Sequence, residues 1–292
     1  MTNTIRILRF TGLASLLFLV FASVNLSAQG LSYTGNLQFS TGDYFFTERT
    51  ESVYFTNGLS WSGSRTRISF NLPYVIQSSP LISYGPSGGI PTGGTGHKQV
   101  GQKSGGRGNH SLNQSGNDHG RVEVIDTVSY QTASFADPSV YGSFRILGAR
   151  STSTSLTLNT SVKIPFAKPS SGFGTGEWDF GAGLSLFQRF RSTFIFGDVM
   201  FWRMGDMADL NLNNPVSLSV GVGRAINNGK WMLSTSAAGS TKIIDSVDPP
   251  ASLNVGLGYY KSTKTSINGT LSVGLSESSS DISAGIGWSY KL

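Results

Sequence analysis

Twelve stretches in which apolar and polar residues alternate follow one another along most of this chain, and they constrain its fold more than any other feature. In the last stretch, apolar side chains occupy every second position from Ile282 to Leu292, with small or polar residues between them. A period of two is typical of β-strands that have one apolar and one polar face. The sequence predicts such strands at about 31–42, 51–62, 65–76, 137–147, 152–165, 177–190, 193–204, 212–225, 230–240, 251–261, 265–275 and 281–292.

The connections between these strands alternate in length. Connections after even-numbered strands are tight, as at Gly63-Ser64, Arg191-Ser192 and 226–229, and those after odd-numbered strands are mostly longer. Outer-membrane barrels have short periplasmic turns, long outer loops and strands of ~9–11 residues. An open sheet edge in lipid would leave backbone groups unsatisfied, so the sheet has to close. We therefore expect an all-β fold, an antiparallel up-and-down transmembrane β-barrel of twelve strands. A soluble β-sandwich, which alternates similarly, is the competing fold.

Residues 1–28 have the order of a secretory signal peptide. Two arginines precede an apolar run over 13–24, and small residues precede a cleavage point after Ala28. The apolar run is shorter than the ~20 residues that a spanning helix needs. We expect cleavage there, with 29–292 forming a barrel in the outer membrane of a bacterial cell.

The two ends of the predicted strands carry further signs of a membrane protein. Gly287, Tyr290 and Leu292 resemble the C-terminal assembly signal of outer-membrane proteins, with Leu in place of the usual Phe. The expected partners are therefore the barrel-assembly machinery and outer-membrane lipid. Aromatic residues near strand ends on the apolar face predict interfacial girdles, although strands are rich in aromatics anyway; they are Trp61, Tyr74, Trp178, Trp231, Tyr259, Trp288 and Tyr290.

Composition excludes several classes of function. The chain contains no cysteine, which rules out disulfides, thiolate metal sites and a cysteine nucleophile. Charged residues make up only 13% of the sequence, and the formal net charge of +6 is not gathered into a basic stripe, so nucleic acid is not an expected partner. A near-neutral mean hydropathy suits a barrel, because half of each strand faces lipid and half faces water.

Residues 77–136 interrupt the alternation and predict a long, partly disordered extracellular loop. Gly85–Gly120 is rich in glycine and has few apolar residues beyond Ile90, Val100 and Leu112, so it cannot build a core of its own. It carries the chain's three histidines, His97, His110 and His119. Their spacing matches no metal-ligand motif. We expect no metal, no cofactor and no catalytic residue.

The strand faces opposite the apolar ones predict the lining of the barrel lumen. The charged candidates on these faces are Arg67, Arg145, Lys163, Glu177, Asp179 and Asp198, with Arg189 and Lys230 on the same parity. Lys163 and Asp179 flank the loop 166–176 symmetrically, so a regular hairpin places them opposite one another. The pair is either a structural ion pair or part of a charged constriction that filters solutes.

Small and apolar residues share the same inward faces. The small ones, among them Gly181, Gly221 and Gly223, either leave room in the lumen or relieve strain where the sheet curves. Phe194, Phe196, Met200 and Trp202 form an apolar strip around Asp198 that suits a hydrophobic solute.

One region resembles a known family. Val162–Pro165, Gly172–Gly176 and Glu177–Leu184, with Asp137–Leu147 as the preceding strand, resemble the outer-membrane transporters of the MetA-pathway phenol-degradation family. The resemblance covers chiefly 137–205. It implies a barrel that passes small solutes, including aromatic or hydrophobic ones, and it brings no catalytic residues. The glycine-rich insertion departs from the family's usual loop.

The expected function is a non-enzymatic outer-membrane channel or transporter-like barrel for passive passage of small-molecule solutes. The alternative is a surface-exposed structural or binding barrel that acts through the loop 77–136. A membrane-embedded hydrolase needs a positioned base, and the only histidines lie in the insertion, which argues against that activity.

Overall fold

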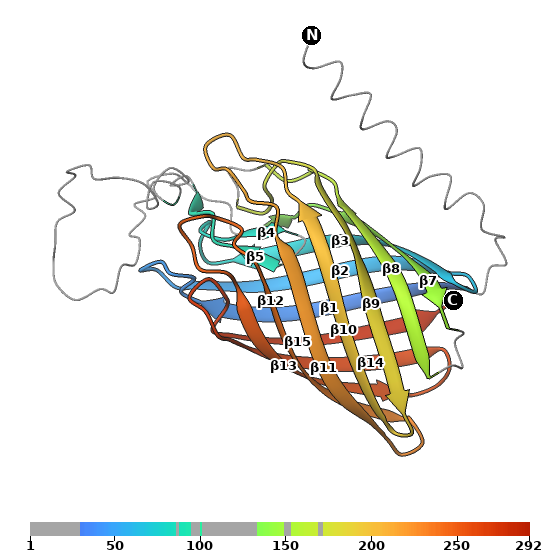
Figure 1. Cartoon of the computed structure of the whole chain (residues 1–292). Helices are drawn as coiled ribbons and strands as arrows, with labels where there is room; N and C mark the ends of the chain where they lie inside the picture. Colours follow the sequence, from blue (N-terminus) through green and yellow to red (C-terminus); the bar gives the residue numbers. More distant parts are fainter. Residues whose placement is uncertain (1–29, 86–87, 95–99, 101–132, 149–152, 169–171) are drawn as a thin grey trace, which may run out of the picture.

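The computed structural model describes residues 30–85, 88–94, 100, 133–148, 153–168 and 172–292 (Figure 1). The predicted signal peptide 1–28, the three histidines and most of the glycine-rich insertion lie outside these residues. Of the connection between the predicted strands at 137–147 and 152–165, the structure describes only Gly148.

Thirteen of the strands in the described residues form one antiparallel sheet that closes on itself. The order is β2-β1-β15-β14-β13-β12-β11-β10-β9-β8-β7-β3-β6, and β2 also pairs with β3. Because β6 and β7 both pair with β3 and occupy one position, the result is a closed barrel of twelve strands. The strands are β1 Gly30–Gly42, β2 Thr50–Ser62, β3 Thr66–Gln77, β6 Ala133–Phe135, β7 Ser139–Leu147, β8 Thr154–Lys163, β9 Asp179–Phe190, β10 Thr193–Arg203, β11 Val216–Ile226, β12 Trp231–Ser240, β13 Ala251–Tyr260, β14 Thr265–Gly274 and β15 Ile282–Lys291.

These strands confirm the predicted fold class, and most of their ends lie close to the predicted ones. The largest difference is at β11, which begins at Val216 instead of 212. Leu212 is buried in a loop cluster, and the Asn213 amide donates to the Ile243 carbonyl at 2.7 Å. Packing against other loops therefore overrides the local alternation over 212–215.

The two faces of the barrel differ in the way the period of two predicts. Leu218 and Val220 of β11 are each 60% exposed on the outer face, whereas Ser219 between them points inward and bonds to Asp198. The same alternation recurs in Leu253, Val255 and Leu257 of β13. An apolar surface of this extent around a closed sheet matches the hydrocarbon layer of a membrane. In the described residues no helix is long and apolar enough to span a membrane.

The start of β1 and the end of β15 lie at the same end of the barrel as the tight turns. Ser32 of β1 pairs with Lys291 of β15, and the Leu292 amide donates to the Leu31 carbonyl at 2.9 Å. The turn between β11 and β12 contains Asn227, Asn228 and Gly229. Their φ angles of 51°, 54° and 83° are left-handed values, which are typical of a tight β-hairpin turn. We call this end of the barrel the turn end, and the opposite end the loop end.

Long connections pack together at the loop end. A buried apolar cluster, here called the loop core, joins the connections after β1, β3, β10 and β12 to Met200 and Trp202 of β10; its other members are Tyr44, Phe45, Phe46, Leu81, Ile82, Ile90, Val100, Met204, Met207, Leu210, Leu212, Ile243, Ile244 and Val247. A small hairpin of β4 (Ser83–Gly85) and β5 (Gly88–Ile90) belongs to this layer. Ile90 and Val100, too few to build a core alone, are buried because other loops supply the remaining side chains.

Candidate functional site in the barrel lumen

Three cavities lie along the inner face of the barrel. The turn-end cavity has a volume of about 780 Å³, the central cavity about 500 Å³ and the loop-end cavity about 740 Å³. The central and loop-end cavities share Tyr54, Tyr84, Asp198, Met200 and Trp202, so they adjoin one another. Most of the lining is serine, threonine, asparagine and glycine, which leaves a polar interior with space in it.

A buried ionic cluster lies on the wall of the central cavity. Lys163 of β8 pairs in register with Asp179 of β9, as hairpin symmetry predicts, and its Nζ lies 2.8 Å from the Asp179 carboxylate. The Lys163 Nζ also lies 3.2 Å from Asp137 Oδ2 and donates to the Thr175 hydroxyl. Asp137 precedes β7 and completes the cluster, although it is not among the charged candidates that the alternation predicts.

Backbone donors satisfy the remaining oxygens of this cluster. Asp137 Oδ1 accepts from the amides of Phe166 and Ala167 at 2.8 and 2.9 Å, and Asp179 Oδ1 accepts from the Gly205 amide at 2.9 Å. The Lys163 side chain is 4% exposed, Asp137 is 1% exposed and Asp179 is fully buried. The ion pair therefore ties β8 and β9 to two connections, and this geometry favours the structural role over the filtering constriction.

Asp198 is the charged candidate that faces open space in the middle of the lumen. It lies on β10 between Ser185 of β9 and Ser219 of β11, and it lines both the central and the loop-end cavities. The Ser219 hydroxyl donates to its carboxylate. A solute crossing the middle of the barrel would pass this group.

The remaining charged candidates lie in different places. Arg67 and Arg145 both line the turn-end cavity. Glu177 is exposed in the connection before β9, next to Gly205, and lines none of these three cavities. Arg189 is exposed and its Nε donates to the Arg191 carbonyl at 2.8 Å.

One predicted orientation is wrong. The Lys230 Nζ lies 5.6 Å from the centre of the Tyr259 ring, and that ring packs against Trp231 on the outer face. Lys230 precedes β12, where the strand no longer fixes the direction of the side chain. Attraction to the face of an aromatic ring therefore turns it outward.

The apolar strip of β10 lies on the inner face and covers glycines of the neighbouring strands. A Cβ atom at Gly221 or Gly223 of β11 would overlap the ring of Phe196 or Phe194, and one at Gly181 of β9 would overlap the Trp202 ring. No larger residue fits at these three positions, because aromatic side chains lie directly over the backbone there. The Trp202 indole donates to the Ser217 hydroxyl at 2.9 Å, which fixes the plane of the ring beside the central and loop-end cavities.

Tyr84 of the β4–β5 hairpin enters the lumen from the loop end, a feature that sequence periodicity does not reveal. Its hydroxyl donates to the Ser52 hydroxyl at 2.5 Å, and its ring centre lies 4.9 Å from that of Tyr54. Since Tyr84 lines both adjoining cavities, the hairpin narrows the lumen where they meet.

The described residues include no group of three or more His, Cys, Asp or Glu side chains arranged to hold a metal ion. The three histidines of the insertion lie outside those residues.

Comparison with known proteins places this architecture among solved barrels. The chain superposes on the COG4313 outer membrane channel from Pseudomonas putida F1 with a TM-score of 0.58 and 10% identity, covering 92% of this chain and 97% of that one. More distant similarities include the NanC porin (TM-score 0.49, 10% identity, 90% and 100% covered) and the CymD monoaromatic hydrocarbon channel (0.46, 8% identity, 90% and 89% covered). No protein-family model and no curated protein matches the chain. The fold is therefore that of an outer-membrane barrel.

Proposed function

We propose that this chain is a bacterial outer-membrane channel for passive passage of small solutes. The observation that carries the proposal is the succession of cavities of about 780, 500 and 740 Å³ inside a barrel with an apolar exterior. A barrel that served only as an anchor would need no such space. The small and hydroxyl-bearing inner residues keep it open to water, as in aqueous barrels.

Aromatic or otherwise apolar solutes are the class that the inner wall suits best. Met200 and Trp202 present apolar surface to the central and loop-end cavities, and the hydroxyl groups of Ser217 and Ser219 lie beside them in the loop-end cavity. A solute with one apolar and one polar side can use both kinds of contact. The resemblance of 137–205 to the MetA-pathway phenol-degradation family supports the same class.

The location and partners follow from the same proposal. The signal peptide 1–28 is cleaved, the barrel-assembly machinery recognises the C-terminal strand, and lipid surrounds the outer face. The chemistry is binding and passage without catalysis. The charged lumen candidates then act as wall and filter groups: Arg67, Arg145 and Asp198 meet the solute, and Lys163 with Asp179 supports the wall.

The test is conductance and uptake by the purified full chain. Reconstituted in planar bilayers it should give discrete current steps, and in liposomes it should accelerate the entry of small aromatic solutes over that of sugars. A barrel that refolds, shows heat-modifiable migration on a gel and yet stays silent and impermeable would contradict the proposal.

A surface-binding barrel acting through 77–136 is the second candidate, and the glycine-rich composition of that segment is what favours it. Leu81, Ile82 and Ile90 of this segment are buried in the loop core. We therefore assign the binding role to residues 101–120. Deleting 103–118 separates the two functions, because a channel keeps its permeability whereas a binding barrel loses its partner.

A further inference from the structure

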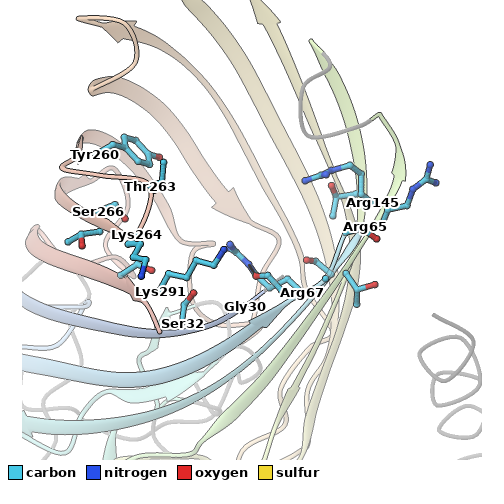
Figure 2. Close-up of a pocket in the computed structure, with 18 of the residues that line it drawn as sticks. Gly30, Ser32, Arg65, Arg67, Arg145, Tyr260, Thr263, Lys264, Ser266 and Lys291 are labelled. Carbon is cyan, nitrogen blue, oxygen red and sulfur yellow. Dashed lines mark hydrogen bonds between the residues drawn. The ribbon is translucent and has the colours of Figure 1, made fainter. Parts of the chain in front are cut away.

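The turn-end cavity carries a concentration of positive charge that the proposed function does not by itself explain. Among the described residues, five basic ones line it and no acidic one does; the five are Arg65, Arg67, Arg145, Lys264 and Lys291. Figure 2 shows Lys264 and Lys291 on one side of the hollow and Arg65 and Arg145 on the other, with Arg67 between them. Hydroxyl groups of the strand ends fill most of the remaining lining.

Backbone pairing brings these like charges next to one another. The Arg145 amide donates to the Arg65 carbonyl at 2.8 Å, and the Lys291 amide donates to the Lys264 carbonyl at 2.8 Å. Like charges on adjacent strands destabilise a sheet. Among the described residues no carboxylate forms an ion pair with Arg65, Arg67, Lys264 or Lys291. The repulsion is offset when an anion lies between these groups.

The acidic side chains that the described part of the chain places in the lumen lie away from this end. Asp198 lines the central and loop-end cavities, and Asp137 and Asp179 are engaged with Lys163. Rings of Arg and Lys select anions in known pores, since a guanidinium binds a carboxylate or phosphate through two parallel hydrogen bonds.

We propose that the turn-end cavity is an anion-binding vestibule that favours small soluble organic anions, carboxylates above all, as the solutes of this barrel. The proposal rests on the proposed channel function and narrows its substrate class. An aromatic or aliphatic acid would meet the basic residues with its carboxylate and the Met200–Trp202 wall with its apolar part.

The absence of cysteine from the chain allows a test that needs no ion current. Ser289→Cys places a thiol on the wall of the turn-end cavity, and Ser272→Cys places a control thiol in the loop-end cavity. Each variant of the full chain, in neutral detergent, is treated with a negatively and a positively charged methanethiosulfonate reagent. The ratio of the two rates, divided by that for a free thiol, reports the local potential.

The expected ratio follows from the number of charges. Arg65, Arg67, Lys264 and Lys291, at about 0.2 kcal/mol each when screened at 0.15 M salt, raise the local concentration of a monovalent anion roughly fourfold and lower that of a monovalent cation by the same factor, so the ratio at S289C is roughly 15. Removing two of these four charges with Arg67→Gln and Lys291→Gln should lower it to roughly 4. Lys242→Gln, at an exposed residue in the connection after β12, should leave it unchanged. A ratio near 1, or one that the double variant does not change, overturns the proposal.

Two additions keep the test decisive. If the double variant does not fold, Lys264→Gln in an exposed turn replaces it, with a proportionally smaller fall in the ratio. Phosphatidylglycerol added to the micelles distinguishes soluble anions from lipid headgroups, which offer similar anionic chemistry. The ratio persists if the basic groups face the cavity, and its collapse to 1 would assign them to lipid and overturn the proposal. A barrel that gives no current and no uptake but shows a high ratio of labelling rates would contradict the proposed channel function, whereas it would still support anion binding in the turn-end cavity.

Discussion

Replacing Lys163 with methionine should destabilise the barrel strongly, because it leaves two carboxylates buried without their cation. Methionine keeps most of the length of the alkyl chain but removes the Nζ atom, which lies 2.8 Å from Asp179 and 3.2 Å from Asp137. Breaking a buried ion pair by removing one partner costs about 3–5 kcal/mol. With about 2–4 °C per kcal/mol for chains of this size, the midpoint of thermal unfolding should fall by about 6–20 °C.

The matched control is Lys261→Met, at an exposed residue after β13, which should lie within about 0.5 kcal/mol of the wild type. Adding Asp179→Asn to Lys163→Met should recover part of the lost stability. It removes one of the two buried carboxylates that have lost their cation, and it keeps an acceptor for the Gly205 amide. Both denaturant unfolding in detergent and heat-modifiable migration measure these changes. If Lys163→Met costs less than about 1 kcal/mol, or mainly changes ion selectivity, then the cluster is not a structural one.

Two further predictions concern the two faces of the barrel sheet, and a third concerns the β4–β5 hairpin. Gly221→Val should cost about 1–3 kcal/mol in denaturant unfolding because its side chain meets the Phe196 ring, whereas Gly269→Ala on the open outer face should be neutral; equal effects would contradict the packing. Val255→Arg should cost about 2–4 kcal/mol when the barrel folds into lipid vesicles, and tolerance there would mean that this face is not in hydrocarbon. Tyr84→Ala should raise single-channel conductance by widening the junction of the central and loop-end cavities, and an unchanged current would place the narrowest point elsewhere.

Periodicity predicts the strands and their faces because the physical cause is local. A period of two assigns each side chain to lipid or lumen, and hairpin symmetry then pairs Lys163 with Asp179. Strand ends escape this rule, as Lys230 shows, because a terminal side chain is free to follow an aromatic ring. Asp137 escapes it too, since it lies in the break between β6 and β7.

The loop core and the basic vestibule are less accessible to sequence reasoning for a different reason. Burial of Ile90 depends on Met204 and Ile243, which lie far away in sequence and come close only once the barrel has closed. The five basic residues of the turn end come from two turns and three strands. The signal that could have found the vestibule is the basic residues of the tight turns, taken together with the inward-facing basic residues at the strand ends beside those turns.

The measurement that tests the central claim most directly compares nitroxide labels at Leu271 and Ser272, neighbours on β14. Leu271 is 50% exposed on the outer face, and Ser272 lines the loop-end cavity. In liposomes the label at 271 should relax with oxygen and the label at 272 with a water-soluble nickel chelate. The reverse pattern, or equal access of the chelate to both labels, would contradict a lipid-facing exterior around a water-filled lumen.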